Sequence, residues 1–298
     1  FMDTTRSLPN VDVVFSADRD NNKIVLRTQT GEYTVTGESS DNFPSIPAFK
    51  GDTELKMDVE TLRKIIMRTT FAVSSDELRP SMTGVFFQIR KKEIRAVATD
   101  GHRLVRLVNS TFSSGSIERE IIIPAKALNI VSKSFTGSDS TLSFNENHAM
   151  FTFGETTLIS RMIEEKYPNY ESVIPLDNEK KLSLDKNQLL ASVRRTSLYA
   201  SSTNHQVRFS LKKGSLTVSA EDLDFGSEAR ESLPCDYAAD PMEIGFNSNY
   251  IIDVLSHLET DEAMFLLHSP TRACIVQPVK QREGENLLML VMPVRLNA

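Results

Sequence analysis

The feature that most constrains the fold of this chain is an internal repeat. Segment 62–74 corresponds to 189–201: both have the hydrophobic period of a helix, both carry Arg-Thr near the end, and both run into Ser-Ser. The strand-like segment 94–100 corresponds in the same way to 216–222. Matching segments lie about 122 to 127 residues apart. The chain is therefore predicted to fold as several similar units rather than around one large core.

Each whole unit has the order helix, strands, helix, strands. The second helix is expected over Pro124–Phe135 in one unit and over Asn247–Leu258 in the other. Asp58, Asp185 and Asn247 stand where N-cap residues would begin helices. The predicted fold class is therefore α+β, with two helices laid on antiparallel sheet in each unit.

A partial third copy precedes the two whole units. Phe1–Leu8 is interpreted as the end of a second helix. The strand-like segments Val11–Phe15, Lys23–Thr28 and Glu32–Thr36 follow it. The opening helix and strands of this copy are absent, so we expect a fragment or a chain whose start is missing.

Two proline-bearing stretches, 43–52 and 174–181, are predicted to be linkers between the units. We therefore expect an incomplete first domain over residues 1–47. Complete second and third domains are expected over 48–175 and 176–298.

The charge balance bears on the possible partners. The chain has 34 Lys and Arg against 40 Asp and Glu, a net charge of −6. Taken alone, this argues weakly against nucleic acid, because neutralising phosphates requires cations. The objection holds only for evenly spread charge, since a ring can be acidic outside and basic inside.

Cys235 and Cys274 form neither a disulfide framework nor a metal motif, which favours the cytoplasm, and the apolar run Leu287–Val294 is too short for a membrane helix.

Basic residues recur on the polar faces of the predicted helices. Lys64 and Arg68 are spaced i, i+4 and are expected to project away from the core. Arg194 and Arg195 flank the corresponding helix of the next unit. Lys126 and Lys133 lie on a second helix. Such a face is either simply solvated or contacts phosphates without reading sequence.

Leu198 and Tyr199 follow a helix, and Leu198 falls nearly opposite its apolar face. Leu198 is therefore expected to be exposed, which is unusual for leucine. Either it tucks under a following loop, or it forms a protein–protein contact with Tyr199.

Motifs for catalysis and cofactor binding are absent from the sequence. It has no phosphate-binding loop of the Walker type, no G-x-S-x-G, and five scattered histidines without metal-ligand spacing. Asp100-Gly101-His102-Arg103 alone resembles a catalytic element. A tight turn at Asp-Gly is the preferred interpretation, and a hydrolase centred on Asp100 and His102 is the alternative. No cofactor and no metal are expected.

The motifs Ala98–Leu104, Glu243–Asn247 and Val291–Leu296, with Phe43-Pro and Tyr167-Pro-Asn-Tyr, resemble the bacterial DNA polymerase III beta subunit, the sliding clamp. The order and spacing of the motifs are specific, although each alone is weak. The resemblance implies three domains per subunit and a homodimeric ring around duplex DNA. It also implies a non-catalytic processivity role, with the polymerase III alpha subunit, the clamp loader and other proteins carrying a clamp-binding peptide as partners.

The resemblance further implies a peptide pocket between the second and third domains. The matching positions are mostly apolar with a few polar ends, as expected for a groove that anchors a short peptide. They are Met82, Thr99, Gly101, His102, Arg103, Leu104, Pro168, Val173, Asn247, Tyr250, Val291, Met292, Pro293, Val294 and Arg295. Ser172 and Asn204 depart from the pattern of familiar relatives and bear on peptide preference.

Two further sets of residues are implied by the same resemblance. Leu198 and Tyr199 match the dimer contact of the third domain, with Tyr33 and Val35 of the first domain opposite. Arg79 matches a DNA-contacting loop and joins the basic helix residues as DNA-facing.

A repeat adhesin that does not bind nucleic acid remains a further alternative, distinguished by the lack of a basic face.

Overall fold

The computed structural model describes residues 1–43, 45 and 49–296. The chain divides into two compact units, Phe1–Phe49 and Lys50–Ala298, each described here by itself. The expected end of the first domain at residue 47, and Pro44 of the Phe43-Pro motif, lie outside the described residues.

The smaller unit contains a short helix and an antiparallel sheet in the order β1-β2-β3. Its elements are α1 (Met2–Ser7), β1 (Val14–Asp18), β2 (Lys23–Arg27), β3 (Glu32–Thr36) and the 3-10 turn η1 (Ser40–Asn42). The first strand begins at Val14 rather than at Val11, because its pairing with β2 runs only from Val14, opposite Arg27 at the end of β2, to Asp18, opposite Lys23. Among its described residues only Leu26 is buried.

The larger unit carries the four helices that the sequence predicts. They are α2 (Val59–Thr69), α3 (Ala125–Ser134), α4 (Lys186–Thr196) and α5 (Ser248–Ser256). The predicted caps are confirmed: Asp58 accepts from the Thr61 N–H at 2.8 Å, and Asp185 accepts from the Gln188 N–H at 2.7 Å. Asn247 caps α5 in the same way. The first helix of each repeat runs on into a 3-10 turn, η2 (Thr70–Ala72) or η5 (Ser197–Tyr199).

We call the segment from β4 to β11 the second repeat and that from β12 to β20 the third repeat. The strands of the second repeat are β4 (Thr53–Asp58), β5 (Gly84–Arg90), β6 (Glu93–Thr99), β7 (Arg103–Asn109), β8 (Arg119–Pro124), β9 (Asp139–Phe144), β10 (His148–Phe153) and β11 (Thr156–Arg161). Those of the third are β12 (Lys180–Asp185), β13 (Gln206–Lys212), β14 (Ser215–Asp222), β15 (Ser227–Pro234), β16 (Asp236–Tyr237), β17 (Met242–Asn247), β18 (Glu262–Leu267), β19 (Cys274–Pro278) and β20 (Glu285–Val291). The alternation of helices and antiparallel strands confirms the α+β prediction.

One sheet crosses from the second repeat into the third. β7 pairs antiparallel with β20, from Asn109 opposite Glu285 to Arg103 opposite Val291. The nine-stranded sheet that results has the order β16-β12-β18-β19-β20-β7-β6-β5-β8. The pairing satisfies the backbone groups of two strands that would otherwise be open edges. We refer to this β7–β20 pairing as the seam.

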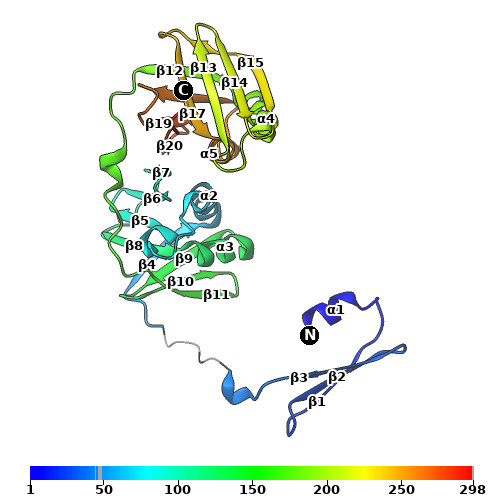
Figure 1. Ribbon diagram of the computed structural model, residues 1–298. Coiled ribbons are helices and arrows are strands. Elements are labelled where there is room, and N and C mark those ends of the chain that lie inside the picture. Colours follow the sequence, from blue (N-terminus) through cyan, green and yellow to red (C-terminus); the bar gives the residue numbers. More distant parts are fainter. Residues whose placement is uncertain (44, 46–48, 297–298) are drawn as a thin grey trace. The chain divides into compact units, whose positions relative to one another are not determined.

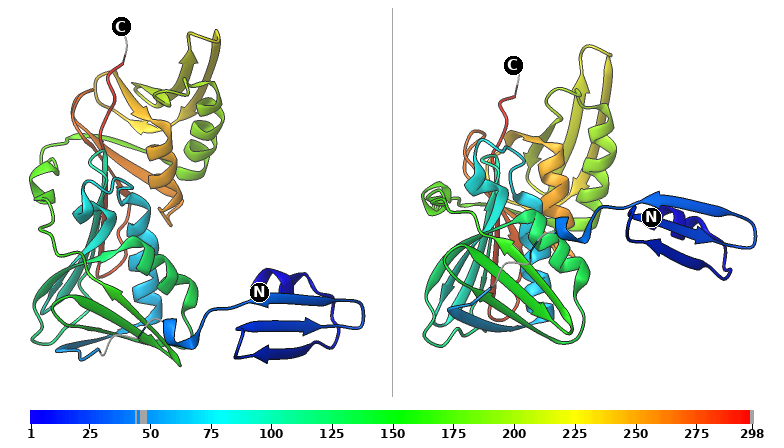
Figure 2. Two further views of the ribbon diagram at one scale, coloured as in Figure 1. Left: turned by 60° about the horizontal axis from the view of Figure 1, so that its bottom comes forward. Right: turned by 90° about the horizontal axis from the view of Figure 1, so that it is seen from below.

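The other two sheets of this unit stay within one repeat each. They have the orders β11-β10-β9-β4 and β15-β14-β13-β17. The four helices lie on one side of the nine-stranded sheet, while the connector 162–179 runs along the opposite side (Figures 1 and 2). Leu62 and Ile65 of α2 and Leu189 and Val193 of α4 are buried in the core beneath the helices. The two repeats thus present their helices on a common wall.

Candidate partner groove and helix face

A tight turn after β6 organises the region where the two repeats meet. Gly101 has φ +92°, a conformation that favours glycine. One Asp100 carboxylate oxygen accepts from the N–H groups of His102 and Arg103, both at 2.9 Å, and the Thr99 hydroxyl accepts from Gly101 at 3.1 Å. The predicted turn is confirmed. The second Asp100 oxygen accepts from Arg103 Nε at 3.2 Å, so the carboxylate serves the turn and Arg103 and does not activate His102.

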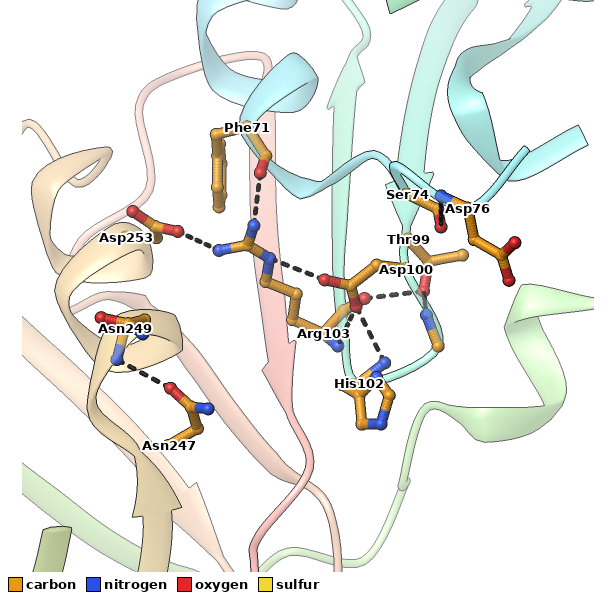
Figure 3. A network of polar contacts seen from close by, with 11 residues as sticks. Phe71, Ser74, Asp76, Thr99, Asp100, His102, Arg103, Asn247, Asn249 and Asp253 are labelled. Atoms are coloured by element: carbon orange, nitrogen blue, oxygen red, sulfur yellow. Dashed lines mark hydrogen bonds and ion pairs between the residues drawn. The ribbon is translucent and has the colours of Figure 1, made fainter. Parts of the chain in front are cut away.

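Arg103 joins three parts of the larger unit (Figure 3). Its Nη2 donates to the carbonyl of Phe71 at 2.7 Å, and its Nη1 pairs with Asp253 on α5 of the third repeat. The guanidinium also lies 4.9 Å from the ring centre of Tyr250 and 5.5 Å from that of Phe71. Burial raises the pKa of the Tyr250 phenol further above its ordinary value of 10.0. Arg103 therefore fixes the Asp100–Gly101 turn, the 3-10 turn η2 and helix α5 to one another.

The chain that follows β20 completes this region. The Met292 N–H donates to the His102 carbonyl at 2.8 Å, and the Val294 N–H donates to the Gly245 carbonyl at 2.9 Å. The segment therefore runs between the turn and β17. Met292 remains 39% exposed, and the ring of His102 lies 6.0 Å from that of Tyr250. Met292 therefore lies in an apolar, partly exposed strip that is bordered by the polar groups of His102 and Tyr250.

The remaining predicted groove residues have different environments. Leu104 and Val291 are buried in the seam, and Met82 is buried at the end of the loop 74–82, where its carbonyl accepts from the Ser74 N–H at 2.8 Å. Asn247 caps α5 and also donates to the Asn204 carbonyl at 3.4 Å. The other four, Pro168, Val173, Pro293 and Arg295, are exposed or partly exposed, and the connector that carries two of them is held by Tyr167 stacking 4.6 Å from Phe86.

Arg79 lies at this turn, a position that sequence reasoning did not foresee. A methyl group added at Gly101 would meet Arg79 Nη1 at 3.2 Å, and Arg79 Nε pairs with Asp76 at 2.7 Å. The only signal in the sequence was the place of Arg79 in a loop just before Met82. Its chain position gave no indication that the loop folds back over the Asp100–Gly101 turn.

The prediction that Arg68 projects into solvent was wrong. Its side chain is only 6% exposed and pairs with Glu259 at 2.7 Å and with Glu285 at 2.6 Å, both in the third repeat. A helical wheel separates the core face from the opposite face, but it cannot show that a neighbouring repeat covers the latter. Arg68 is therefore removed from the surface available to phosphates.

The other basic residues remain at least partly accessible. Lys126 and Lys133 on α3 and Arg194 on α4 are exposed, and Lys64 is half-buried with Glu60 at 3.8 Å. Arg195 is exposed but already paired with a carboxylate, because its guanidinium donates to both oxygens of Glu231 at 2.7 Å. These side chains come from three helices on the same side of the nine-stranded sheet.

The expected exposure of Leu198 is confirmed, since the residue is 81% exposed and its neighbour Tyr199 is 44% exposed. In the smaller unit, Tyr33 is exposed and Val35 half-buried on β3. Across the residues that the structure describes, no group of three or more His, Cys, Asp or Glu side chains could hold a metal ion. No helix in that part of the chain has the length and apolarity needed to cross a membrane.

Comparison with known proteins divides the chain at the same place as the two repeats. The central-domain model of the DNA polymerase III beta subunit matches residues 56–169, and the C-terminal-domain model matches residues 171–295. Beta sliding clamps of Pseudomonas putida and Synechococcus elongatus are 27% and 29% identical over 297 and 305 residues, covering 99% of this chain and 80% of each relative.

Solved structures give the same result. A Pseudomonas aeruginosa DNA polymerase sliding clamp superposes with a TM-score of 0.86 at 26% identity, covering 99% of this chain and 80% of that one. A Bartonella birtlesii clamp bound to griselimycin gives 0.88 at 26% identity, covering 99% and 79%. The fold is that of a sliding clamp. The chain belongs to the DNA polymerase III beta subunit family of bacteria.

Proposed function

We propose that this chain is a processivity factor that encircles duplex DNA as a homodimer and carries no catalytic activity of its own. It would tether the polymerase III alpha subunit, the clamp loader and other proteins with a clamp-binding peptide. The bacterial chromosome lies in the cytoplasm, so the chain would act there. The observation that carries the proposal is the seam, because it joins two repeats so that their helices share one wall.

Contact with DNA would be electrostatic and independent of sequence. Exposed cations on the helix side, such as Lys126, Lys133 and Arg194, can approach phosphates, while the net charge of −6 requires acidic residues elsewhere. Few such contacts are needed, because encirclement rather than affinity would retain the protein on DNA. Affinity for short linear DNA is accordingly expected to be weak and to fall with salt.

The repeat suggests how a ring would close. Within the chain, the last strand of the third repeat, β20, pairs with the edge strand β7 of the second. The strand that corresponds to β7 in the third repeat is β15, which ends its own sheet, and the last strand of the first unit is β3. We infer that β15 of one copy pairs with β3 of a second copy, with Leu198 and Tyr199 beside Tyr33 and Val35. Two such junctions would close a twofold-symmetric ring.

The partner groove would lie beside the Arg103 network. Met292 and the flanking chain supply apolar surface, and His102 and Tyr250 supply polar groups at its border. A short, extended peptide with one or two large apolar side chains fits this chemistry. Exposed Val173 and Pro168 on the connector would border the same groove.

Retention on circular DNA tests the function. Loaded on a nicked circle by a clamp loader, the protein should remain bound through gel filtration at moderate salt and should be lost after the circle is cut. The topological constraint alone explains this difference. Equal retention on circular and linear DNA would contradict encirclement.

A further inference from the structure

Arg68 lies at one end of the seam, away from the Arg103 network. Its partner Glu285 is the first residue of β20, whereas Arg103 faces the last residue of that strand, Val291. The seam is thus bounded by two arginines of the second repeat that both reach into the third. Arg103 adjoins the proposed groove, and Arg68 lies outside it.

The contacts of Arg68 form a closed network of charges. Arg68 Nη1 donates to Glu285 at 2.6 Å. Arg68 Nε and Nη2 donate to the two carboxylate oxygens of Glu259, at 3.2 and 2.7 Å. Arg282 also pairs with Glu259. Two arginines therefore balance two glutamates, and only Arg68 comes from the second repeat.

Burial makes the Arg68–Glu285 pair of this network sensitive to the loss of a partner, whereas Arg282 and Glu259 are 50% and 42% exposed. The side chains of Arg68 and Glu285 are 6% and 15% exposed. Burial lowers the pKa of the Arg68 guanidinium, but the hydrogen bonds that it donates to Glu259 and Glu285 outweigh this and raise the pKa. A charge left alone in such a place is costly, whereas the balanced set is tolerated.

The other three members of the network come from two loops and one strand of the third repeat, since Glu285 begins β20. Glu259 lies between α5 and β18, and Arg282 lies between β19 and β20. Because Arg68 lies in the last turn of α2, its side chain connects that helix with the α5–β18 loop and with the start of β20. The β19–β20 loop joins through the pair between Arg282 and Glu259. Neither repeat could form this network without the other.

We propose that Arg68, Glu259, Arg282 and Glu285 form a latch that holds the second and third repeats in one fixed relation. The latch closes the end of the seam distant from the groove and prevents β20 from separating from β7. Opening it would allow the repeats to hinge about the Arg103 end. Since the proposed groove draws residues from both repeats, its shape would depend on the latch; this consequence alone rests on the proposed function.

Hydrogen exchange in the full chain tests the latch directly. Arg68→Met keeps an apolar stem of similar length but leaves Glu285 without its cation, while Glu259 keeps Arg282. Seam amides of β7 and β20 should exchange faster by on the order of 10- to 100-fold, while amides of β9, β10, β13 and β14 should change little. Arg195→Met is the matched control, because Arg195 also binds one glutamate through two nitrogens but within a single repeat.

A second substitution separates the charge network from simple packing. Adding Glu285→Met to Arg68→Met removes a buried unpaired charge and should return much of the seam protection. If Arg68→Met does not fold, Glu285→Gln alone should still accelerate seam exchange, by a smaller factor. Exchange in Arg68→Met that matches the Arg195→Met control, or that rises equally in all strands, would overturn the latch.

Binding of a fluorescent clamp-binding peptide, measured in parallel by polarisation, distinguishes the two proposals. Weaker binding together with a looser seam supports both the latch and its link to the groove. A looser seam with unchanged binding keeps the latch and removes that link. Failure of the wild-type chain to bind the peptide contradicts the groove and leaves the exchange result unaffected.

Discussion

Two arginines of the second repeat, Arg68 and Arg103, show how much one side chain can contribute to the junction between repeats. Each guanidinium donates in several directions at once, to carboxylates from different elements. Arginine suits this role because its planar fork presents five donors in fixed geometry, whereas a lysine ammonium is a single compact charge.

Replacing Arg103 by lysine is expected to destabilise the larger unit by about 2–4 kcal/mol. One ammonium cannot reach Asp100, Asp253 and the Phe71 carbonyl together, so at least one partly buried acceptor loses its partner. The midpoint of urea unfolding measures the effect. Arg106→Lys on the same strand is the control, because Arg106 donates to Asn286 alone at 3.1 Å; equal costs for the two variants would contradict the assigned role.

Glu259 should make the stability of the chain depend on pH under acidic conditions. Burial raises the pKa of this carboxyl, but the hydrogen bonds from Arg68 and the nearby charges of Arg68, Arg282 and Lys64 outweigh it, so the pKa lies below its ordinary value of 4.5. A carboxyl with a lowered folded-state pKa stabilises the fold at pH above the unfolded value. That contribution is lost as the pH falls through the folded value.

The measurement is the difference in Tm between the wild type and Glu259→Gln as a function of pH. It should be largest near neutrality and should shrink between about pH 5 and 3. Other carboxyls with lowered pKa values, such as Glu231 and Glu243, remain in both proteins and cancel in this difference. A constant difference across that window would show that Glu259 does not contribute through its charge.

At the scale of elements, edge strands account for most of the architecture. β7 and β20 complete each other, and the residues after β20 continue along β17 through a single bridge between Gly245 and Val294. The close approach at that bridge requires glycine. A methyl group on Gly245 would lie 2.7 Å from the Val294 carbonyl oxygen and 2.8 Å from Leu296.

Gly245→Ala should therefore displace the segment 292–296 from β17 at a cost of about 1–3 kcal/mol. Faster exchange of the Val294 amide would report the displacement, and weaker peptide binding by polarisation would follow if the groove lies there. Gly37→Ala is the control, because its added methyl group would meet Asn22 at an ordinary 3.5 Å. An unchanged Val294 amide would contradict the assigned contact.

At the scale of the whole molecule, the proposed ring depends on surfaces that a single copy leaves open. Leu198→Asp places a charge on an exposed apolar residue beside β15 and should shift a dimer towards monomer in sedimentation velocity, by at least about tenfold in dissociation constant. Leu176→Asp is the matched control, since Leu176 is 97% exposed on the connector. Equal sedimentation of the two variants would remove Leu198 from the interface.

Much of the fold was predictable from the chain. The helices within each repeat, their caps at Asp58 and Asp185 and the Asp100–Gly101 turn depend on residues close in sequence, where hydrophobic period and hydrogen-bonding side chains act locally. The basic residues of the helices were also identified, but the sequence showed only which helix face each one lies on. It did not show whether a neighbouring repeat covers that face. The assignment of Arg68 failed because its partners are 191 and 217 residues distant in the chain.

The amino-acid sequence by itself determined the repeating α+β units and the family, because period, caps and motif order are local properties that every copy must carry. Only the tertiary structure decided which edges meet and which charges are buried. Those outcomes depend on strand pairing between repeats and on desolvation at their junction, and neither is encoded in any short segment. The seam and its two arginines are therefore features of the folded chain that pattern alone does not predict.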